Sequence, residues 1–217
     1  MRGCVLAGVW GAGKTSVYQR TLGRLVAAGC ESLIAMPQAA TITTHTYTPG
    51  APHDHAAHIL SWLDHLTAFL EETNRRFQAS TLPKHRFASA WTPTCLLEGL
   101  GFDAPMYGLP ISRGALTGVE QRLAALGVHL VLLRVPDDRV RAQCVESTRH
   151  HRGPKWARYL EGFGSTDVER AEHIRQVQAE LIRWAQTSPL PLQVLDTTTQ
   201  DWDAYSRHVA ELIADQT

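Results

Sequence analysis

The sequence predicts an α/β fold in which a mostly parallel central sheet lies between two layers of helices. Short apolar runs, typical of buried parallel strands, alternate along the chain with longer stretches of helical periodicity. The chain has 217 residues, of which 44% are hydrophobic. That length supplies the core of one such domain and is too short for two large ones. We therefore expect residues 1–217 to form a single domain.

Five apolar runs are the candidate strands. Each is four to eight residues long, which suits strands that cross a sheet once. One of them is weak, because Pro83 interrupts it and proline cannot donate a hydrogen bond to a neighbouring strand. The candidates are Cys4–Gly8, Leu33–Met36, Ser80–Phe87, His129–Val135 and Leu192–Leu195.

Helical periodicity fills most of the sequence between these runs. The candidate helices are Lys14–Ala28, His58–Phe77, Val119–Leu126, a stretch from Pro136 to Thr148, Asp167–Ala185 and Trp202–Ala214. Residues 39–56 are rich in Thr, Pro and His and are expected to form a loop. Residues 90–118 contain several prolines and are expected to be irregular. A regular alternation of strand and helix favours parallel pairing with helices on both faces.

Composition argues against several classes of partner. Lys plus Arg and Asp plus Glu are balanced at 21 each, so the basic excess of a nucleic-acid-binding protein is missing. No segment approaches the roughly 20 consecutive apolar residues that span a bilayer. The four cysteines are far apart and form no CxxC pair, which favours reduced thiols in a cytoplasmic protein. A homodimer is compatible with the sequence.

The most specific feature is a glycine-rich motif near the N-terminus. Residues 8–15, GVWGAGKT, fit G-x-x-x-x-G-K-[ST] at every fixed position, after an apolar run and before a helix. Glycine lets successive N–H groups point into one concavity, and the helix that follows presents its unpaired N–H groups to an anion. The motif therefore predicts a site for the phosphates of a nucleoside triphosphate. The expected contacts are Gly8, Gly11, Ala12, Gly13, Lys14, Thr15 and Ser16.

Two side chains of the motif have separate expected roles. Lys14 supplies a positive charge to the terminal phosphates, and Thr15 supplies a hydroxyl ligand to Mg²⁺. ATP and Mg²⁺ are accordingly the expected cofactors. Trp10 lies inside the motif, where it either covers the bound phosphates or packs against a neighbouring loop, and we favour the second.

The chain resembles the nucleoside and nucleotide kinases, and the thymidylate kinase and deoxynucleoside kinase branch is the nearest. The resemblance rests on the glycine motif, a helical insertion, a strand that ends in an arginine motif at Arg86, and a strand followed by Pro136-Asp137-Asp138, a helix and a basic segment. It implies a three-layer P-loop NTPase fold and transfer of a phosphoryl group from ATP to a small acceptor, first a nucleoside or nucleotide. Residues 39–118 would then form an acceptor-side insertion and residues 149–165 a lid.

The resemblance also assigns candidate residues around the acceptor and the transferred phosphate. Arg149 and Arg152 match the basic residues of the lid and are the expected catalytic cations, with Lys155 a weaker candidate. The turn at residues 197–199 is similar in place to the loop that holds adenine. The acceptor-binding candidates are Gln38, Asp54, Arg86 and Trp91.

Two positions depart from the family pattern. Gln38 and His85 stand where the family has carboxylates, and a glutamine side chain cannot take a proton from an acceptor. The carboxylates left to serve are Asp54, Asp64, Glu98 and Asp103.

Other functions remain open at this point. The acceptor is alternatively a natural product or antibiotic. The chain is otherwise a nucleotide-binding regulatory NTPase without productive transfer, which the missing carboxylates favour and the basic lid opposes. A minor alternative is a zinc site among His45, His53, His55 and His58.

Overall fold

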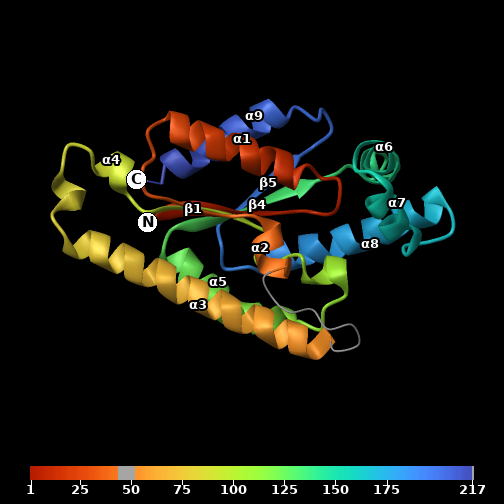
Figure 1. Cartoon of the computed structure of the whole chain (residues 1–217), viewed down its shortest axis with the longest axis horizontal. Helices are drawn as coiled ribbons and strands as arrows, with labels where there is room; N and C mark the ends of the chain where they lie inside the picture. The colour runs from red at the N-terminus through yellow and green to blue at the C-terminus, as the bar shows by residue number, and fades with distance from the viewer. Residues whose placement is uncertain (44–51, 217) are drawn as a thin grey trace.

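The computed structural model describes residues 1–43 and 52–216 and has a parallel sheet at its centre (Figure 1). Five strands pair in the order β2-β3-β1-β4-β5, and every pairing is parallel. The α/β class expected from the sequence is thereby confirmed. The strands are β1 (Arg2–Ala7), β2 (Leu33–Met36), β3 (Thr94–Glu98), β4 (Val128–Arg134) and β5 (Leu192–Asp196).

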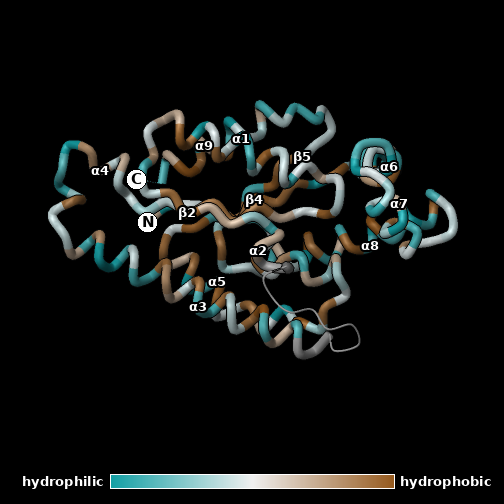
Figure 2. Tube along the Cα trace, viewed as in Figure 1, coloured by the Kyte–Doolittle hydropathy of each residue, from teal (hydrophilic) through white to brown (hydrophobic). Residues whose placement is uncertain are grey.

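Helices cover both faces of the sheet. On one face α1 (Lys14–Ala27) packs against α9 (Trp202–Ala214), and on the other lie α3 (Pro52–Ala79), α5 (Arg113–Ala125) and α8 (Asp167–Gln186). Apolar residues concentrate along the strands and on the helix sides that face them (Figure 2). Every residue of β1 is buried, because the strand has neighbours on both edges and helices on both faces.

Local signals explain where several helices begin. In the capping box of α8, Thr166 Oγ1 accepts the N–H of Glu169 and Glu169 accepts the N–H of Thr166, each at 3.2 Å. The side chains of Ser112 and Asp201 accept backbone N–H groups at the starts of α5 and α9. These bonds satisfy donors that have no partner within the helix, which fixes the first residue of each helix.

The third strand is not where the sequence placed it. Residues 80–87 form no strand; α3 continues to Ala79 and is followed by the short helices η1 (Leu82–Lys84) and α4 (Ala88–Trp91). The strand is instead β3, within the stretch expected to be irregular, and it lies between β1 and β2. Residues 39–118 therefore contribute a central strand rather than standing wholly outside the sheet. Another helix, α2 (Gln38–Thr43), begins the stretch expected to be a loop.

The segments after β3 and β4 gather at one end of the molecule. They are the short helix η2 (Ala104–Tyr107), the π-helical η3 (Arg141–Glu146), α6 (Ser147–His151) and α7 (Pro154–Glu161). Figure 1 shows α6 and α7 beyond the carboxyl ends of the strands, at the right of the view. The chain leaves β1 toward β2 on one side and later enters β4 on the other, and ligands of such sheets bind at this switch in direction.

Within the part of the chain that the structure describes, no helix combines the length and apolar character needed to cross a membrane.

Candidate functional site

The loop between β1 and α1, residues 8–13, is here called the glycine loop. Gly11 and Gly13 have φ angles of 77° and 90°, and a Cβ atom on them would lie 2.7 Å from Cys144 Cα and 2.2 Å from the Trp202 ring. Only glycine fits at either position. Because Gly13 is also the N-cap of α1, no side chain caps the first N–H groups of that helix. The loop therefore offers backbone donors that an anion can bind.

Lys14 folds back over the glycine loop. Its side chain is buried, and Nζ donates to the carbonyl oxygens of Gly8 at 2.6 Å and Val9 at 3.1 Å. Burial lowers the pKa of the Lys14 ammonium to about 8, although the charges of Glu98 and Asp103 oppose that shift. A cation is thus held inside the loop with no carboxylate bonded directly to it in the described structure.

Glu98, the last residue of β3, joins three strand ends. Its carboxylate is buried; Oε1 accepts the hydroxyl proton of Thr15 at 2.8 Å, and Oε2 accepts the N–H of Gln38 at 3.1 Å. Thr15 follows β1 and Gln38 follows β2, so both contacts arise because parallel strands end at one edge of the sheet. Glu98 was one of four carboxylates that the sequence left open. It ends the third strand, the position for which the misplaced strand had suggested His85.

Asp103 and Gln38 form a second polar pair beside this one. Gln38 Nε2 donates to Asp103 Oδ2 at 3.0 Å and to Tyr107 Oη at 3.4 Å. Burial raises the pKa of the Asp103 carboxyl, opposed by the Gln38 hydrogen bond and the charge of Lys14.

The turn that carries Asp103 is strained. Gly99, Leu100 and Gly101 all have positive φ angles, of 85°, 43° and 84°. A Cβ on Gly99 would lie 2.7 Å from Asp103 Oδ2, so the residue after Glu98 has to be glycine. Sequence reasoning missed this turn. Its signal was an apolar run ending in an acid, followed by Gly-x-Gly and a second acid.

Two cavities flank the glycine loop, and Gly11, Gly13 and Arg152 line both. The first, the Gln38 cavity, has a volume of about 310 Å³ and is also lined by Trp10, Lys14, Thr15, Gln38, Glu98, Met106, Tyr107 and Trp156. The second, the Trp202 cavity, has a volume of about 280 Å³ and is also lined by Ser16, Gln143, Ser147, Thr148, His151, Gln200 and Trp202. Gly8 and Ala12, the remaining predicted phosphate contacts, lie in the glycine loop and line neither cavity.

Arg152 stands at the boundary between the two cavities. It is exposed, and its guanidinium lies 4.9 Å from the centre of the Trp156 ring. Arg149, the other expected catalytic cation, lines neither cavity. Both its terminal nitrogens donate to Asp167, at 2.8 and 2.5 Å, and this pairing lowers the pKa of the Asp167 carboxyl. The structure therefore separates two arginines that the sequence treated as equivalent.

Gln143 forms hydrogen bonds with both the glycine loop and the residue that follows β5. Its Nε2 donates to Gly11 O at 3.2 Å and to Thr197 Oγ1 at 3.1 Å, and its Oε1 accepts from Gln200 at 3.4 Å. The side chain is buried within the π-helical η3, a distortion that is frequent at functional sites. Nothing in the sequence pattern singled out this residue.

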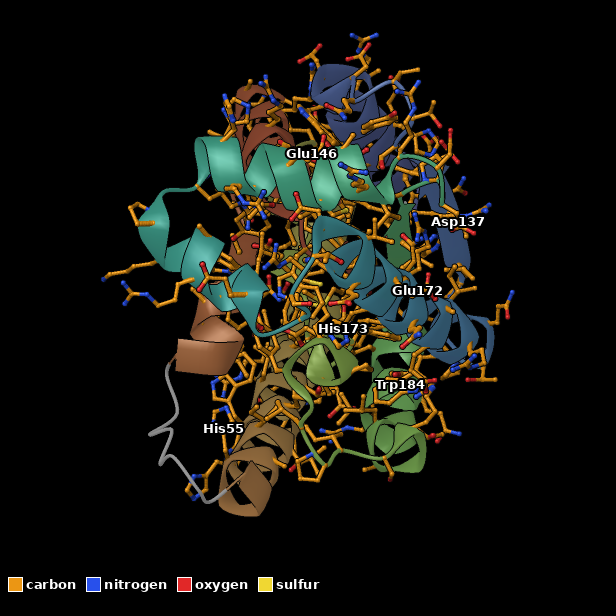
Figure 3. The ribbon with its side chains drawn as sticks, turned by 90° about the vertical axis from the view of Figure 1, so that its right-hand side faces the viewer. His55, Asp137, Glu146, Glu172, His173 and Trp184 are labelled. Carbon is orange, nitrogen blue, oxygen red and sulfur yellow. The ribbon has the colours of Figure 1, made fainter. Side chains whose placement is uncertain are left out.

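Trp10 packs into an aromatic cluster and also lines the Gln38 cavity. The ring is buried, with centroids 4.6 Å from Phe163, 6.1 Å from Tyr159 and 6.3 Å from Tyr107. His173 of α8 stacks on Phe163 at 4.6 Å, and Figure 3 shows it at this end of the molecule. The cluster connects the glycine loop to residues 149–165, the segment interpreted as a lid.

The structure does not bring Arg86 and Trp91 to the Gln38 cavity, although the sequence had placed them beside an acceptor. Both precede β3 and lie at the amino end of the sheet, opposite the glycine loop (Figure 1). Arg86 lies over the Phe87 ring, and Trp91 Nε1 donates to Glu31 at 2.8 Å. The misplaced third strand caused the error, since it put these residues at a carboxyl end.

The remaining acidic and histidine candidates do not complete a site. Asp64 pairs with Arg122 on the surface. The side chain of Asp54 lies outside the described residues, as do His45 and the side chain of His53. Among the residues that are described, no group of three or more His, Cys, Asp or Glu side chains could hold a metal ion.

No protein-family model matches the sequence, and no curated protein matches it either.

Proposed function

We propose that the chain is a P-loop phosphotransferase that moves a phosphoryl group from ATP to a small acceptor, a nucleoside or nucleotide first. One observation carries the proposal. The glycine loop lies between two cavities, and Lys14 and the Thr15–Glu98 pair line one of them. A group-transfer enzyme with two substrates needs such an arrangement, because donor and acceptor must meet with their reacting atoms aligned.

The donor would occupy the Trp202 cavity and extend its phosphates into the glycine loop. Free N–H groups at the start of α1 and the Lys14 ammonium bind the phosphate oxygens. Ser16, Gln200 and Trp202 line the space left for the nucleoside part. Gln143 holds Gly11 against the end of β5, which keeps the loop curved while the cavity fills.

Thr15 and Glu98 fit the expected Mg²⁺. The ion prefers oxygen ligands, and the Thr15 hydroxyl lies 2.8 Å from a Glu98 carboxylate oxygen, so both point to one place. These two side chains would hold the ion. Bound there, Mg²⁺ would neutralise charge on the phosphates.

The acceptor would occupy the Gln38 cavity. Its hydroxyl oxygen attacks the terminal phosphorus, the bond to the bridging oxygen breaks, and ADP leaves. Arg152 lines both cavities, so its guanidinium can stabilise the negative charge of the phosphoryl group during transfer. Glu98 bears the one carboxylate among the described residues lining that cavity, and because it would hold Mg²⁺, the hydroxyl proton is released to water.

The test is ADP release from Mg²⁺–ATP across nucleosides, nucleoside monophosphates and hydroxylated natural products. We expect one class to stimulate release, with Lys14→Ala and Glu98→Gln about 100-fold slower or worse. Lys155→Ala, which changes a lid lysine that lines neither cavity, is the matched control and should match wild type. ATP binding with no stimulation by any acceptor would instead identify a regulatory nucleotide-binding module.

A further inference from the structure

We propose that the Gln38 cavity selects an uncharged or cationic alcohol as acceptor and rejects a phosphorylated one, and that Asp103 is the positioning residue for this choice. The inference rests on the proposed phosphotransferase function and names its substrate class. It predicts that nucleosides or hydroxylated natural products are substrates and that nucleoside monophosphates are not, a choice that the proposed function leaves open.

The first argument is charge. The Gln38 cavity has two basic residues in its described lining, Lys14 and Arg152. Lys14 is bonded to the glycine loop and Arg152 also lines the Trp202 cavity, so the donor phosphates would engage both. The other described lining residues include no lysine or arginine, which leaves an acceptor phosphate without a cation of its own. A site without a dedicated cation disfavours a dianionic acceptor.

The second argument is the orientation of Gln38. A carboxylate only accepts hydrogen bonds, so Asp103 can bond only the NH₂ half of the Gln38 amide. Tyr107 Oη lies on the same Nε2. The carbonyl oxygen is then the half of the amide presented to a ligand, and it recognises a hydroxyl or N–H donor. A fully ionised phosphate has no proton to donate to it.

Asp103 is well placed to hold this orientation. It is 5% exposed, and its Oδ2 packs so closely against Gly99 that a Cβ on that residue would lie only 2.7 Å away. A carboxylate confined in this way cannot swing into the cavity, so it acts on the acceptor through Gln38 rather than by contact.

The cavity walls add a preference for a flat ring. Trp10, Tyr107 and Trp156 line the cavity together with Met106. Aromatic faces bind apolar rings and also tolerate cations, whereas they give a phosphate no hydrogen-bond donors beyond the ring edges. A volume of about 310 Å³ suits a small ring-bearing alcohol.

The experiment compares each acceptor with its own phosphate ester. ADP release from Mg²⁺–ATP is measured with two such pairs, thymidine with thymidine monophosphate and deoxycytidine with its monophosphate, and also with chloramphenicol as a neutral alcohol that is not a nucleoside. We expect kcat/KM for the phosphorylated member of the productive pair to be about 100-fold lower or worse. A monophosphate that is used as well as its nucleoside, or better, overturns the inference and leaves the phosphotransferase proposal standing. If no acceptor stimulates release, the phosphotransferase proposal itself fails, and the inference with it.

The role of Asp103 is tested by Asp103→Asn, with Tyr107→Phe as control. Asparagine offers either an oxygen or an NH₂ group, so the Gln38 amide can rotate by 180° and present its NH₂ group to the acceptor. We expect the acceptor KM to rise about tenfold or more while the ATP KM stays constant. Discrimination against the phosphate ester should fall. Tyr107→Phe keeps the Asp103 contact and should keep the discrimination. Equal discrimination in Asp103→Asn and wild type would refute the positioning role. Should Asp103→Asn fail to fold, Gln38→Leu, which removes the amide carbonyl, must show the same rise in acceptor KM.

Discussion

At the residue scale, the surroundings of Lys14 explain how a cation can be held inside the glycine loop. Desolvation disfavours its charge, while the carbonyl oxygens of Gly8 and Val9 and the nearby Glu98 favour it. The balance leaves the pKa of the ammonium at about 8, close to the working pH of most proteins. A polyphosphate that approaches the loop would therefore meet a group able to take up a proton.

Nucleotide binding should become pH-dependent above pH 8. In the free protein Lys14 loses its proton as the pH rises through about 8, and bound phosphate raises that pKa again. Binding therefore takes up a proton in this range, and affinity for Mg²⁺–ATP should fall by up to about tenfold per pH unit. Calorimetric titration in buffers of different ionisation enthalpy measures both quantities.

Lys14→Arg is the matched control for that measurement, because a guanidinium keeps its charge throughout the range. Its affinity, whatever the absolute value, should be flat between pH 8 and pH 9.5. The same pH dependence in both proteins would assign the proton to another group.

At the element scale, the turn after β3 is the structural requirement that the site depends on most. It reverses the chain within three residues of positive φ and so brings Asp103 back beside Gln38. Glycine adopts positive φ readily, so the strain falls on Leu100, where it costs about 1–3 kcal/mol and persists because the surroundings impose it.

Gly99→Ala should destabilise the protein and raise the acceptor KM together. The new methyl meets both an unfavourable φ and the Asp103 carboxylate at 2.7 Å, so we expect a loss of about 2–4 kcal/mol in urea unfolding. Gly108→Ala, at a φ of 58° with open space around it, should lose only about 1 kcal/mol and keep its acceptor KM. Equal losses would mean that the Asp103 contact does not constrain the turn.

The lid segment should show a clear difference between its two arginines. Arg152→Ala removes the cation at the boundary of the cavities, so kcat should fall about 100-fold with little change in the ATP KM. Arg149→Ala removes an exposed pair with Asp167, which contributes at most about 1 kcal/mol to stability, and should leave kcat within a few-fold of wild type. Steady-state kinetics of the two variants test this difference. A larger fall in kcat for Arg149→Ala would assign the catalytic role to Arg149 instead of Arg152.

At the scale of the whole molecule, the strand order of the sheet brings residues that are far apart in the sequence together in one site. Because β2, β3 and β1 are parallel neighbours, Gln38, Glu98 and Thr15 arrive at the same edge although up to 83 residues separate them. The chain after β4 also reaches that edge, where Gln143 bonds Gly11 and Phe163 packs on Trp10 of the glycine loop.

The sequence was most informative where the signal is local. Residues 8–15 are contiguous, and the motif carries its own geometry, so the loop, Lys14 and Thr15 could be assigned without a structure. Glu98 was not assigned, because its five-residue run between Pro93 and Gly99 lies in a proline-containing stretch that was expected to be irregular. That single error moved Arg86 and Trp91 to the wrong end of the sheet. The Gln143 contacts depend on tertiary packing alone.

The most direct measurement is calorimetric titration of the protein with Mg²⁺–ATP at pH 7, with Lys14→Ala and Lys155→Ala in parallel. We predict one nucleotide bound per chain, affinity reduced about 100-fold or more in Lys14→Ala, and no change in Lys155→Ala. Absence of binding to the wild-type protein, or equal affinity in wild type and Lys14→Ala, would contradict a phosphate site in the glycine loop.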